Sequence, residues 1–161
     1  MQNTTLLFLI KKQANKISHI CLAMKKRGFG VGRWNGVGGK VLDGESVEDA
    51  LIRETQEEIG VNVKNKNFRK VADLSFIFQR QSTWNQVTHV YFCERWEGEP
   101  KESEEMNPKW FGVDELPFPQ MWPDDPFWLP KVISGKLVKG NFIFDKGDIV
   151  LEHNMEVVEA F

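Results

Sequence analysis

The sequence lacks any long hydrophobic run. None of its apolar stretches approaches the roughly 20 residues that a helix needs to cross a bilayer. The first stretch, TTLLFLI, ends at Lys11 and Lys12. It also lacks the preceding basic region and the length of a secretory signal, so it is typical of a first strand. We therefore expect a soluble, cytoplasmic protein with no membrane partner.

The chain also has little excess of either positive or negative charge, and it has few cysteines. The formal net charge is −2, so no overall basic field is present to hold a nucleic acid polymer, and none is expected as a partner. The two cysteines, Cys21 and Cys93, lie in apolar runs and do not have the spacing of metal ligands. We expect buried free thiols, which favour a reducing compartment.

Tyrosine is nearly absent, with one residue, whereas the chain has six Trp and twelve Phe. This aromatic balance suits a large core or a pocket for flat ligands, and composition alone does not choose between them. A chain of 161 residues is long enough for one well-buried domain and short for two. Residues 1–161 are therefore expected to form a single domain.

Hydrophobic patterning predicts strands before and after one strong helix. The expected strands cover 5–10, 17–24, 70–79, 86–96, 109–113 and a pair within 140–158. The polar segment 11–16 is expected to be a hairpin loop. Four prolines break 114–128, and a second helix is expected over 129–135. This order predicts a mixed α/β sandwich around a sheet.

The strong helix runs from Ser46 to about Ile59 and carries an unusual acidic cluster. Ser46 and Asp49 resemble a capping box, and Gly60 is the usual residue just past a helix end. The stripe that should be apolar comprises Val47, Ala50, Leu51, Glu54 and Glu58, with Glu57 one row to the side. Two carboxylates therefore stand where apolar residues are expected.

Two interpretations of this cluster remain open at the level of the residues. It can be a solvated acidic face, partly paired with Arg53. Partial burial of such a cluster, however, costs several kcal/mol unless a positive charge neutralises it. A hard divalent cation does so, and Mg²⁺ prefers a few carboxylates together with water and phosphate oxygens.

The spacing of these residues resembles the signature of the Nudix family. The segment GKVLDGESVEDALIRETQEEIGV, residues 39–61, matches every fixed Gly, Glu and Arg of that signature, and departs only at Thr55, where an aliphatic or aromatic residue is expected. The resemblance implies an α/β/α sandwich with a mixed sheet. It also implies Mg²⁺- or Mn²⁺-dependent cleavage of a nucleoside diphosphate linked to another group.

The same resemblance implies roles for residues of the motif. The metal would be held by Glu54, Glu57, Glu58 and the Gly39 carbonyl, with Glu105 as a further carboxylate outside the motif. Arg53 would orient the cluster by ion pairing, and Glu45 matches a structural acid. Glu58 and Glu105 are both candidates for the group that deprotonates water. For Glu105, a merely charged loop is the alternative.

Other segments resemble the oxidised purine nucleoside triphosphatases within that family. They are MKKRGFGVGRWNGVGGK, ESEEMNPKWF, PFPQMWPDDPFW and GNFIF. The resemblance implies hydrolysis of 8-oxo-dGTP, and of 2-hydroxy-dATP, to the monophosphate and pyrophosphate by a monomer. Another nucleotide substrate (a methylated purine triphosphate, a dinucleoside polyphosphate or a nucleotide sugar) and an inactive nucleotide-sensing module are the alternatives.

The resemblance further implies a base pocket. Hydrogen bonds to the base would come from Asn35, Asp124 and Asp125, with Trp122 as the stacking platform. A Pro-bounded turn with capping aspartates is the alternative for WPDDPFW. Phe76 and Phe78 also suit the core. The remaining positions that the resemblance assigns to the substrate are Lys25, Phe29, Trp128, Phe144 and Thr5. Arg27 and Arg33 lie beside Lys25 as candidates to attract a triphosphate.

Overall fold

The computed structural model describes residues 1–161 and contains one eight-stranded sheet. Seven strands follow the order β3-β2-β1-β5-β4-β7-β8, and β6 pairs with β2. Pairs β1–β5 and β4–β7 are parallel and the others are antiparallel, so the sheet is mixed as predicted. The strands are β1 (Gln2–Gln13), β2 (Lys16–Lys25), β3 (Trp34–Asn35), β4 (Phe68–Phe78), β5 (Gln86–Cys93), β6 (Met106–Gly112), β7 (Leu137–Asp145) and β8 (Ile149–Val158).

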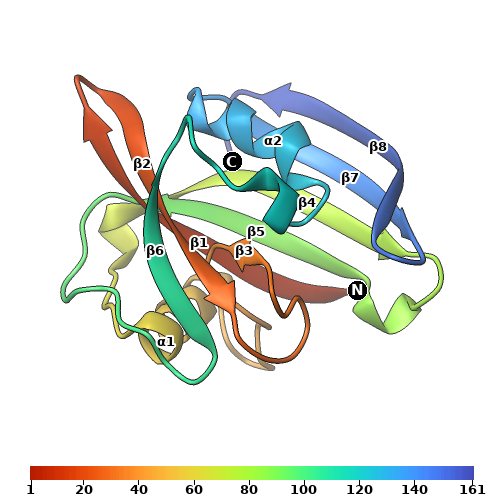
Figure 1. Ribbon diagram of the computed structural model, residues 1–161, viewed down its shortest axis with the longest axis horizontal. Helices are drawn as coiled ribbons and strands as arrows, with labels where there is room; N and C mark the ends of the chain where they lie inside the picture. The colour runs from red at the N-terminus through yellow and green to blue at the C-terminus, as the bar shows by residue number, and fades with distance from the viewer.

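Two α-helices lie on opposite sides of this sheet (Figure 1). They are α1 (Val47–Ile59) and α2 (Asp125–Ile133), and short 3-10 turns η1 (Asn65–Asn67), η2 (Ser82–Trp84) and η3 (Phe118–Gln120) complete the fold. Each helix packs on its own buried cluster, since Leu51 of α1 belongs to one and Leu129 of α2 to the other. The expected α/β/α sandwich is confirmed. No helix is long and apolar enough to cross a membrane.

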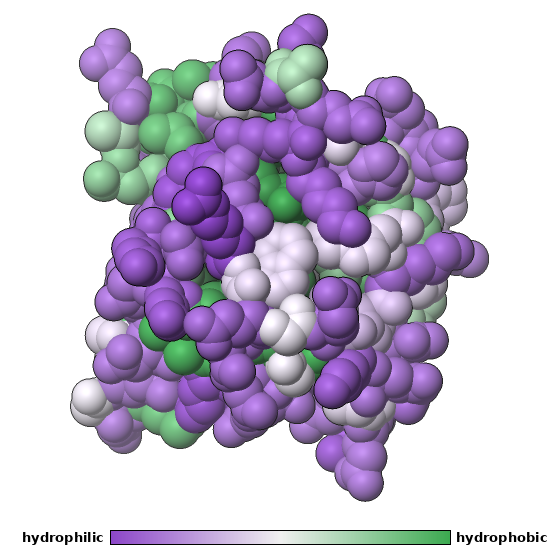
Figure 2. Space-filling model, turned by 90° about the vertical axis from the view of Figure 1, so that its left-hand side faces the viewer, coloured by the Kyte–Doolittle hydropathy of each residue, from purple (hydrophilic) through white to green (hydrophobic).

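Strand β1 contributes side chains to both buried clusters, because its residues point alternately to the two faces of the sheet. Leu7 and Leu9 pack in the α1 cluster, whereas Phe8 and Ile10 pack in the α2 cluster. Because successive side chains of a strand point to opposite faces, this apolar run holds the two layers together. The face of the molecule in Figure 2 is mostly hydrophilic, with small apolar patches between charged side chains.

The hairpin between β1 and β2 is tighter than predicted. The expected loop over 11–16 shrinks to Ala14 and Asn15, whose φ values of 51° and 64° are both left-handed. Positive φ at both central residues defines the turn that matches the twist of two paired strands. The polar residues around it are exposed strand ends, so their polarity suggested a loop where the backbone is extended.

Among the other boundaries that differ from the prediction, two involve proline. Helix α2 begins at Asp125, four residues before the expected start, because Pro126 lies in the first turn, where a helix needs no N–H bond. Strand β6 begins at Met106 and includes Pro108, which is tolerated because β6 has β2 as its one partner. The predicted helix 46–59 is confirmed, with Ser46 Oγ accepting from the Asp49 N–H and Gly60 left-handed at φ 70°.

The glycine-rich segment after β3 runs directly along β1. The Leu7 N–H donates to Val37 O at 2.7 Å, and the Thr5 N–H donates to Gly39 O at 2.9 Å. A Cβ atom on Gly38 would lie 1.9 Å from the Thr5 carbonyl oxygen, well inside contact distance. Glycine at this position therefore lets the segment approach β1 and bring Gly39 to α1.

We predict that Gly38→Ala lowers the free energy of unfolding by about 3 kcal/mol, because the added methyl forces the segment away from β1. Gly112→Ala is the matched control, since a Cβ on Gly112 meets nothing within 4 Å. Urea denaturation measures both variants. Equal stability of the two variants would show that the close approach to β1 is not needed.

Candidate active site

Arg53 ties helix α1 to the loop that precedes it. Its guanidinium donates to both carboxylate oxygens of Glu45, at 2.8 and 2.9 Å, and to the Lys40 carbonyl at 3.1 Å. It also donates to Glu54 at 2.8 Å and, less closely, to Glu57 at 3.4 Å. The hydrogen bonds from Arg53, together with one from the Leu42 N–H, lower the pKa of Glu45 to about 2. Arg53 thus orients two of the predicted metal-binding carboxylates and holds the loop against the helix.

Glu58 is the most deeply buried member of the acidic cluster. Its side chain is buried, Oε1 accepts from the Gly38 N–H at 2.8 Å, and Oε2 has no partner. Burial raises the pKa of Glu58 to about 8, although the Gly38 N–H and the Lys25 charge oppose the rise. The negative charges of Glu54 and Glu105 contribute to it. A solvated acidic face is therefore a wrong description of Glu58.

The carboxylates do not form a closed set of metal ligands. No group of three or more His, Cys, Asp or Glu side chains converges on one ion position. Glu54 lies against Gly39, where an added Cβ would be 2.7 Å from its carboxyl carbon, while the Glu57 side chain is 57% exposed. The partnerless oxygen of Glu58 and its raised pKa nevertheless fit the hard oxygen ligands and positive charge of a divalent cation.

Thr55, the departure from the family signature, is accommodated in place. Its side chain is fully buried, and its hydroxyl donates to the Leu51 carbonyl one helical turn earlier, at 2.7 Å. This bond satisfies the only polar group that the substitution introduces. The helix therefore keeps its position on the sheet.

A cavity of about 460 Å³ lies on the other side of β1 from helix α1. The eleven residues that the family resemblance assigned to the substrate all line it, whereas Arg27, a candidate to attract the triphosphate, does not. The eleven residues are Thr5, Lys25, Phe29, Asn35, Phe76, Phe78, Trp122, Asp124, Asp125, Trp128 and Phe144. Gly38 and Gly39 also line the cavity, and they lie against Glu58 and Glu54. The cavity therefore reaches the carboxylate helix.

Asp124 and Asp125 are both buried in the cavity wall. The Trp128 Nε1–H donates to Asp124 Oδ2 at 2.7 Å, whereas Asp125 Oδ2 has no partner. Burial raises the pKa of Asp124 to about 6, and burial together with the neighbouring Asp124 charge raises the pKa of Asp125 well above its usual value. Neither carboxyl caps α2, because Asp124 at the N-cap position makes no side-chain capping bond. The capping alternative is wrong, and the pair is suited to share a proton.

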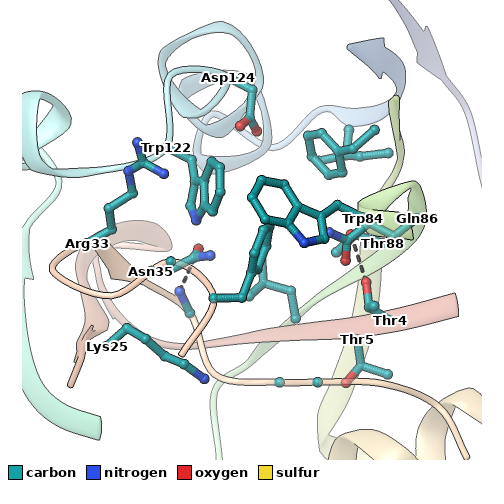
Figure 3. Close-up of a pocket in the computed structure, with 18 of the residues that line it drawn as sticks. Thr4, Thr5, Lys25, Arg33, Asn35, Trp84, Gln86, Thr88, Trp122 and Asp124 are labelled. Carbon is teal, nitrogen blue, oxygen red and sulfur yellow. Dashed lines mark hydrogen bonds between the residues drawn. The ribbon is translucent and has the colours of Figure 1, made fainter. Parts of the chain in front are cut away.

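Trp122 presents one face to the cavity. The Arg33 guanidinium lies 4.1 Å from its ring centre and pairs with Asp148 at 2.9 Å. Figure 3 shows Trp122 between Arg33 on one side and the cavity with Trp84 on the other. Arg33 is therefore engaged with the platform and the β7–β8 turn while it also lines the cavity, and its attraction of a triphosphate stays a prediction. Lys25 remains beside the cavity, 3.8 Å from Glu105.

Several aromatic residues serve the core and the cavity together. Phe78, Phe144 and Trp128 are buried in the α2 cluster and also line the cavity. Phe78 and Phe144 stack with ring centres 4.9 Å apart, while the half-buried Phe76 stacks on a neighbour in β7 at 5.6 Å. Phe76 and Phe78 therefore belong both to the core and to the cavity lining, since one wall of the cavity is the surface of the core.

The threonine that faces the cavity is Thr4. Its neighbours of the same parity, such as Phe8, pack in the α2 cluster, and its hydroxyl lies 2.8 Å from that of Thr88. Thr5 contributes to the lining, but its side chain points to the α1 face, where the hydroxyl is buried without a partner. Strand alternation therefore separates the two threonines, and the contact of Thr5 with the substrate stays a prediction.

Glu105 and Arg27 lie at the rim. Glu105 is not part of the cavity lining, and its side chain is 44% exposed. It pairs with Arg27 at 3.5 Å, and Arg27 also approaches Glu104 at 3.6 Å. The charge of Glu105 contributes to the raised pKa of Glu58, so the two acids are close enough to interact. The structure brings Glu105 near the cluster without making it a direct neighbour of the helix carboxylates.

One wall of the cavity was not predicted from the sequence. Gln2 and Thr4 of β1 stand beside Gln86 and Thr88 of β5 in register, and Trp84 of η2 covers them. Short polar stretches around a predicted turn carry no signal for this arrangement. The parallel pairing of two strands that lie more than 80 residues apart in the chain creates it.

A loop and helix that carry a cluster of carboxylates, beside a cavity large enough for a nucleotide, define the class of protein. Residues 2–132 match the model of the NUDIX domain, and the chain belongs to the Nudix family. It is 44% identical over 140 residues to an oxidized purine nucleoside triphosphate hydrolase from Danio rerio, covering 87% of this chain and 88% of that protein. The Mus musculus protein of the same name is 43% identical over 88% of this chain and 89% of its own.

Solved structures agree on the fold. A MutT protein from Bacillus halodurans superposes with a TM-score of 0.81 at 24% identity, covering 97% of this chain and 98% of that one. A MutT NUDIX hydrolase from Burkholderia pseudomallei covers 73% of this chain and 88% of its own, with a TM-score of 0.59 at 28% identity. The core sandwich and its helix are therefore those of the family.

The raised pKa of Glu58 generates a prediction for stability. Its pKa is about 8 in the folded protein and 4.5 as a free side chain, so the folded state binds this proton more tightly. The associated stabilisation is complete below the lower value and is lost as pH rises through the higher one. Without metal, the free energy of unfolding of the wild type should fall more steeply between about pH 5 and pH 9 than that of Glu58→Gln.

Glu57→Gln is the control, because the Glu57 side chain is 57% exposed, and it should keep the wild-type slope. Added Mg²⁺ should reduce the alkaline loss in the wild type, since a cation favours the charged carboxylate. Denaturant titrations across this pH range measure all three proteins. Parallel slopes for wild type and Glu58→Gln would contradict the burial argument.

Proposed function

We propose that this protein hydrolyses oxidised purine nucleoside triphosphates to the monophosphate and pyrophosphate. The observation that carries the proposal is the buried Asp124–Asp125 pair in an aromatic cavity that adjoins the carboxylate helix. The two vertebrate relatives named for this activity support it. They match the chain over most of its length and not over the Nudix motif alone.

The polar groups of the cavity suit a purine base. Asn35 Oδ1 accepts from the Gly36 N–H at 2.8 Å, so its amide N–H₂ is free to donate to a carbonyl of the base. A proton shared by Asp124 and Asp125 leaves one carboxyl as an acceptor and the other as a donor. Such a pair can accept from the amino group and donate to the carbonyl oxygen of an oxidised guanine, and with its proton moved it can serve an oxidised adenine.

The aromatic groups suit a flat ligand. Trp122, backed by Arg33, offers one face to the cavity. Stacking of a base on an aromatic ring contributes roughly 1–3 kcal/mol. Phe76, Phe78 and Phe144 would then enclose the base from the side of the core.

The phosphates would extend towards α1. Glu54, Glu57 and Glu58, with the Gly39 carbonyl, would hold Mg²⁺ or Mn²⁺, and Glu105 would assist from the rim. When bound, the cation lowers the pKa of water and neutralises charge on the phosphate oxygens. The protein itself orients the cluster through Arg53, and Lys25 supplies a positive charge between the cavity and Glu105.

The proposal includes a monomer that acts on free nucleotides in the cytoplasm. Cys21 and Cys93 are free and buried, which supports a reducing compartment.

We predict Mg²⁺-dependent release of pyrophosphate from 8-oxo-dGTP and 2-hydroxy-dATP, at a higher kcat/KM than from dGTP or ADP-ribose. Glu58→Gln should lower turnover about 100-fold with the fold intact, because the cluster loses a charge that the metal requires. Pyrophosphate assays on the four substrates, with circular dichroism of the variant, provide the measurement. Preference for ADP-ribose would defeat the proposal.

We also predict that Asp124→Asn and Asn35→Ala change the preference among bases more than they change kcat, because both residues would contact the base and not the phosphates. The measurement is kcat/KM for each of the purine triphosphates above. Gln120→Ala, at an exposed position outside the cavity lining, is the control and should leave the ranking unchanged. A uniform loss for every nucleotide would refute the assignment of these residues to base recognition.

A further inference from the structure

The cavity wall formed by β1 and β5 contains a side-chain amide, that of Gln86, without a hydrogen-bond partner in the protein. Gln86 lines the cavity and is half-buried, and its side-chain amide makes no hydrogen bond within the protein. Its strand neighbour Gln2 differs, because the Gln2 amide donates to the backbone at 3.0 and 3.2 Å. An amide that is partly removed from water gains most from a ligand that offers it both a donor and an acceptor.

The two threonines below Gln86 extend this polar wall. Thr4 Oγ1 donates to the Val87 carbonyl at 3.3 Å and lies 2.8 Å from Thr88 Oγ1. With the Thr4 proton used in this way, the Thr88 hydroxyl donates to Thr4, and its own lone pairs face the cavity. The wall therefore presents one N–H₂ group and two oxygen acceptors.

This wall stands opposite the groups that would read the other edge of a base. In Figure 3, Gln86, Thr88 and Thr4 lie on one side of the cavity, whereas Asn35 and Asp124 lie on the other. Trp84 lies next to Gln86, and it is held by edge-to-face contacts with Phe29 at 5.1 Å and Phe78 at 5.6 Å. A flat base gripped at one edge by Asn35 and Asp124 would therefore direct another edge at Gln86.

Oxidation at C8 changes the hydrogen-bonding character of one purine edge. An ordinary purine has an acceptor at N7 and a C–H at C8. An 8-oxo purine has an N7–H donor next to a C8 carbonyl acceptor, which is the pattern of an amide. A carboxamide side chain pairs with this pattern through two hydrogen bonds, and with the ordinary edge through one.

We propose that Gln86, supported by the Thr4–Thr88 pair, is the residue that distinguishes an 8-oxo purine from the unmodified base. This inference rests on the proposed function for its substrate class and adds the contact that senses the oxidation. The helix carboxylates do not take part in it, so Gln86 acts on the selection of the base and not on the cleavage of the phosphoanhydride.

The test measures the binding of nucleoside monophosphates by titration calorimetry in the absence of metal. The wild type should bind 8-oxo-dGMP about 10- to 100-fold more tightly than dGMP, as expected for an additional hydrogen-bonded pair in a partly buried site. Gln86→Leu should lose this preference, with dGMP affinity changed by less than about 3-fold. Gln120→Leu, exposed on η3, is the matched control and should retain the preference.

A ligand-side comparison makes the test independent of any variant. 8-bromo-dGMP places bulk at C8 but has neither the N7–H nor the C8 carbonyl, so it should bind the wild type no more tightly than dGMP. Equal affinity for the bromo and oxo nucleotides would overturn the inference. So would an unchanged preference in Gln86→Leu, or an equal loss for both nucleotides in that variant, which would indicate a structural role.

The outcome is separable from that of the proposed function. If the wild type prefers 8-oxo-dGMP and Gln86→Leu loses this preference, but the wild type does not hydrolyse 8-oxo-dGTP with Mg²⁺, the proposed activity fails and the assignment of Gln86 stands. If the wild type hydrolyses 8-oxo-dGTP but Gln86→Leu keeps the full preference, the activity stands and the assignment of Gln86 fails.

Discussion

The structure depends on carboxyl groups that are buried without a positive partner. Glu58 has one oxygen bound by the Gly38 N–H and the other bound by nothing, and Asp125 likewise has an oxygen with no partner. Burial raises the pKa of both groups. Such burial is costly and is retained where function needs a group poised to gain or lose a proton, or to meet a cation. In this chain the two sites lie on opposite sides of one strand, β1.

Residues 35–39 connect these two sites and hold them at a fixed separation. Asn35 faces the cavity, Gly38 binds Glu58, and Gly39 lies against Glu54. The stretch is itself bonded along β1, so none of these residues can shift without the others. A ligand with a base at one end and phosphates at the other would meet both sites together. These bonds fix the position of the cavity residues relative to the carboxylate helix. Small displacements between a bound substrate and catalytic groups lower a reaction rate by large factors.

The fold was predictable where the signals were local, and the errors came from polarity and proline. Ser46 and Gly60 set the ends of α1 correctly because a cap and a left-handed glycine act within one turn. The hairpin loop was overestimated since its polar residues are exposed strand ends, and α2 starts early because Pro126 suits a first turn. All eleven residues that the family resemblance suggested for the substrate line the cavity, whereas Thr4, which also lines it, was not predicted from the sequence.

The sequence by itself determined the helix, its caps, the carboxylates at positions expected to be apolar, and the family. These features depend on residues that lie close together in the chain. Only the tertiary structure decided that Arg33 backs Trp122, that Glu58 is buried, and that Gln86 and Thr88 stand beside Thr4 in one wall. The reason is physical. Burial and cross-strand neighbours arise when segments more than 80 residues apart pair in parallel, and no local pattern specifies that register.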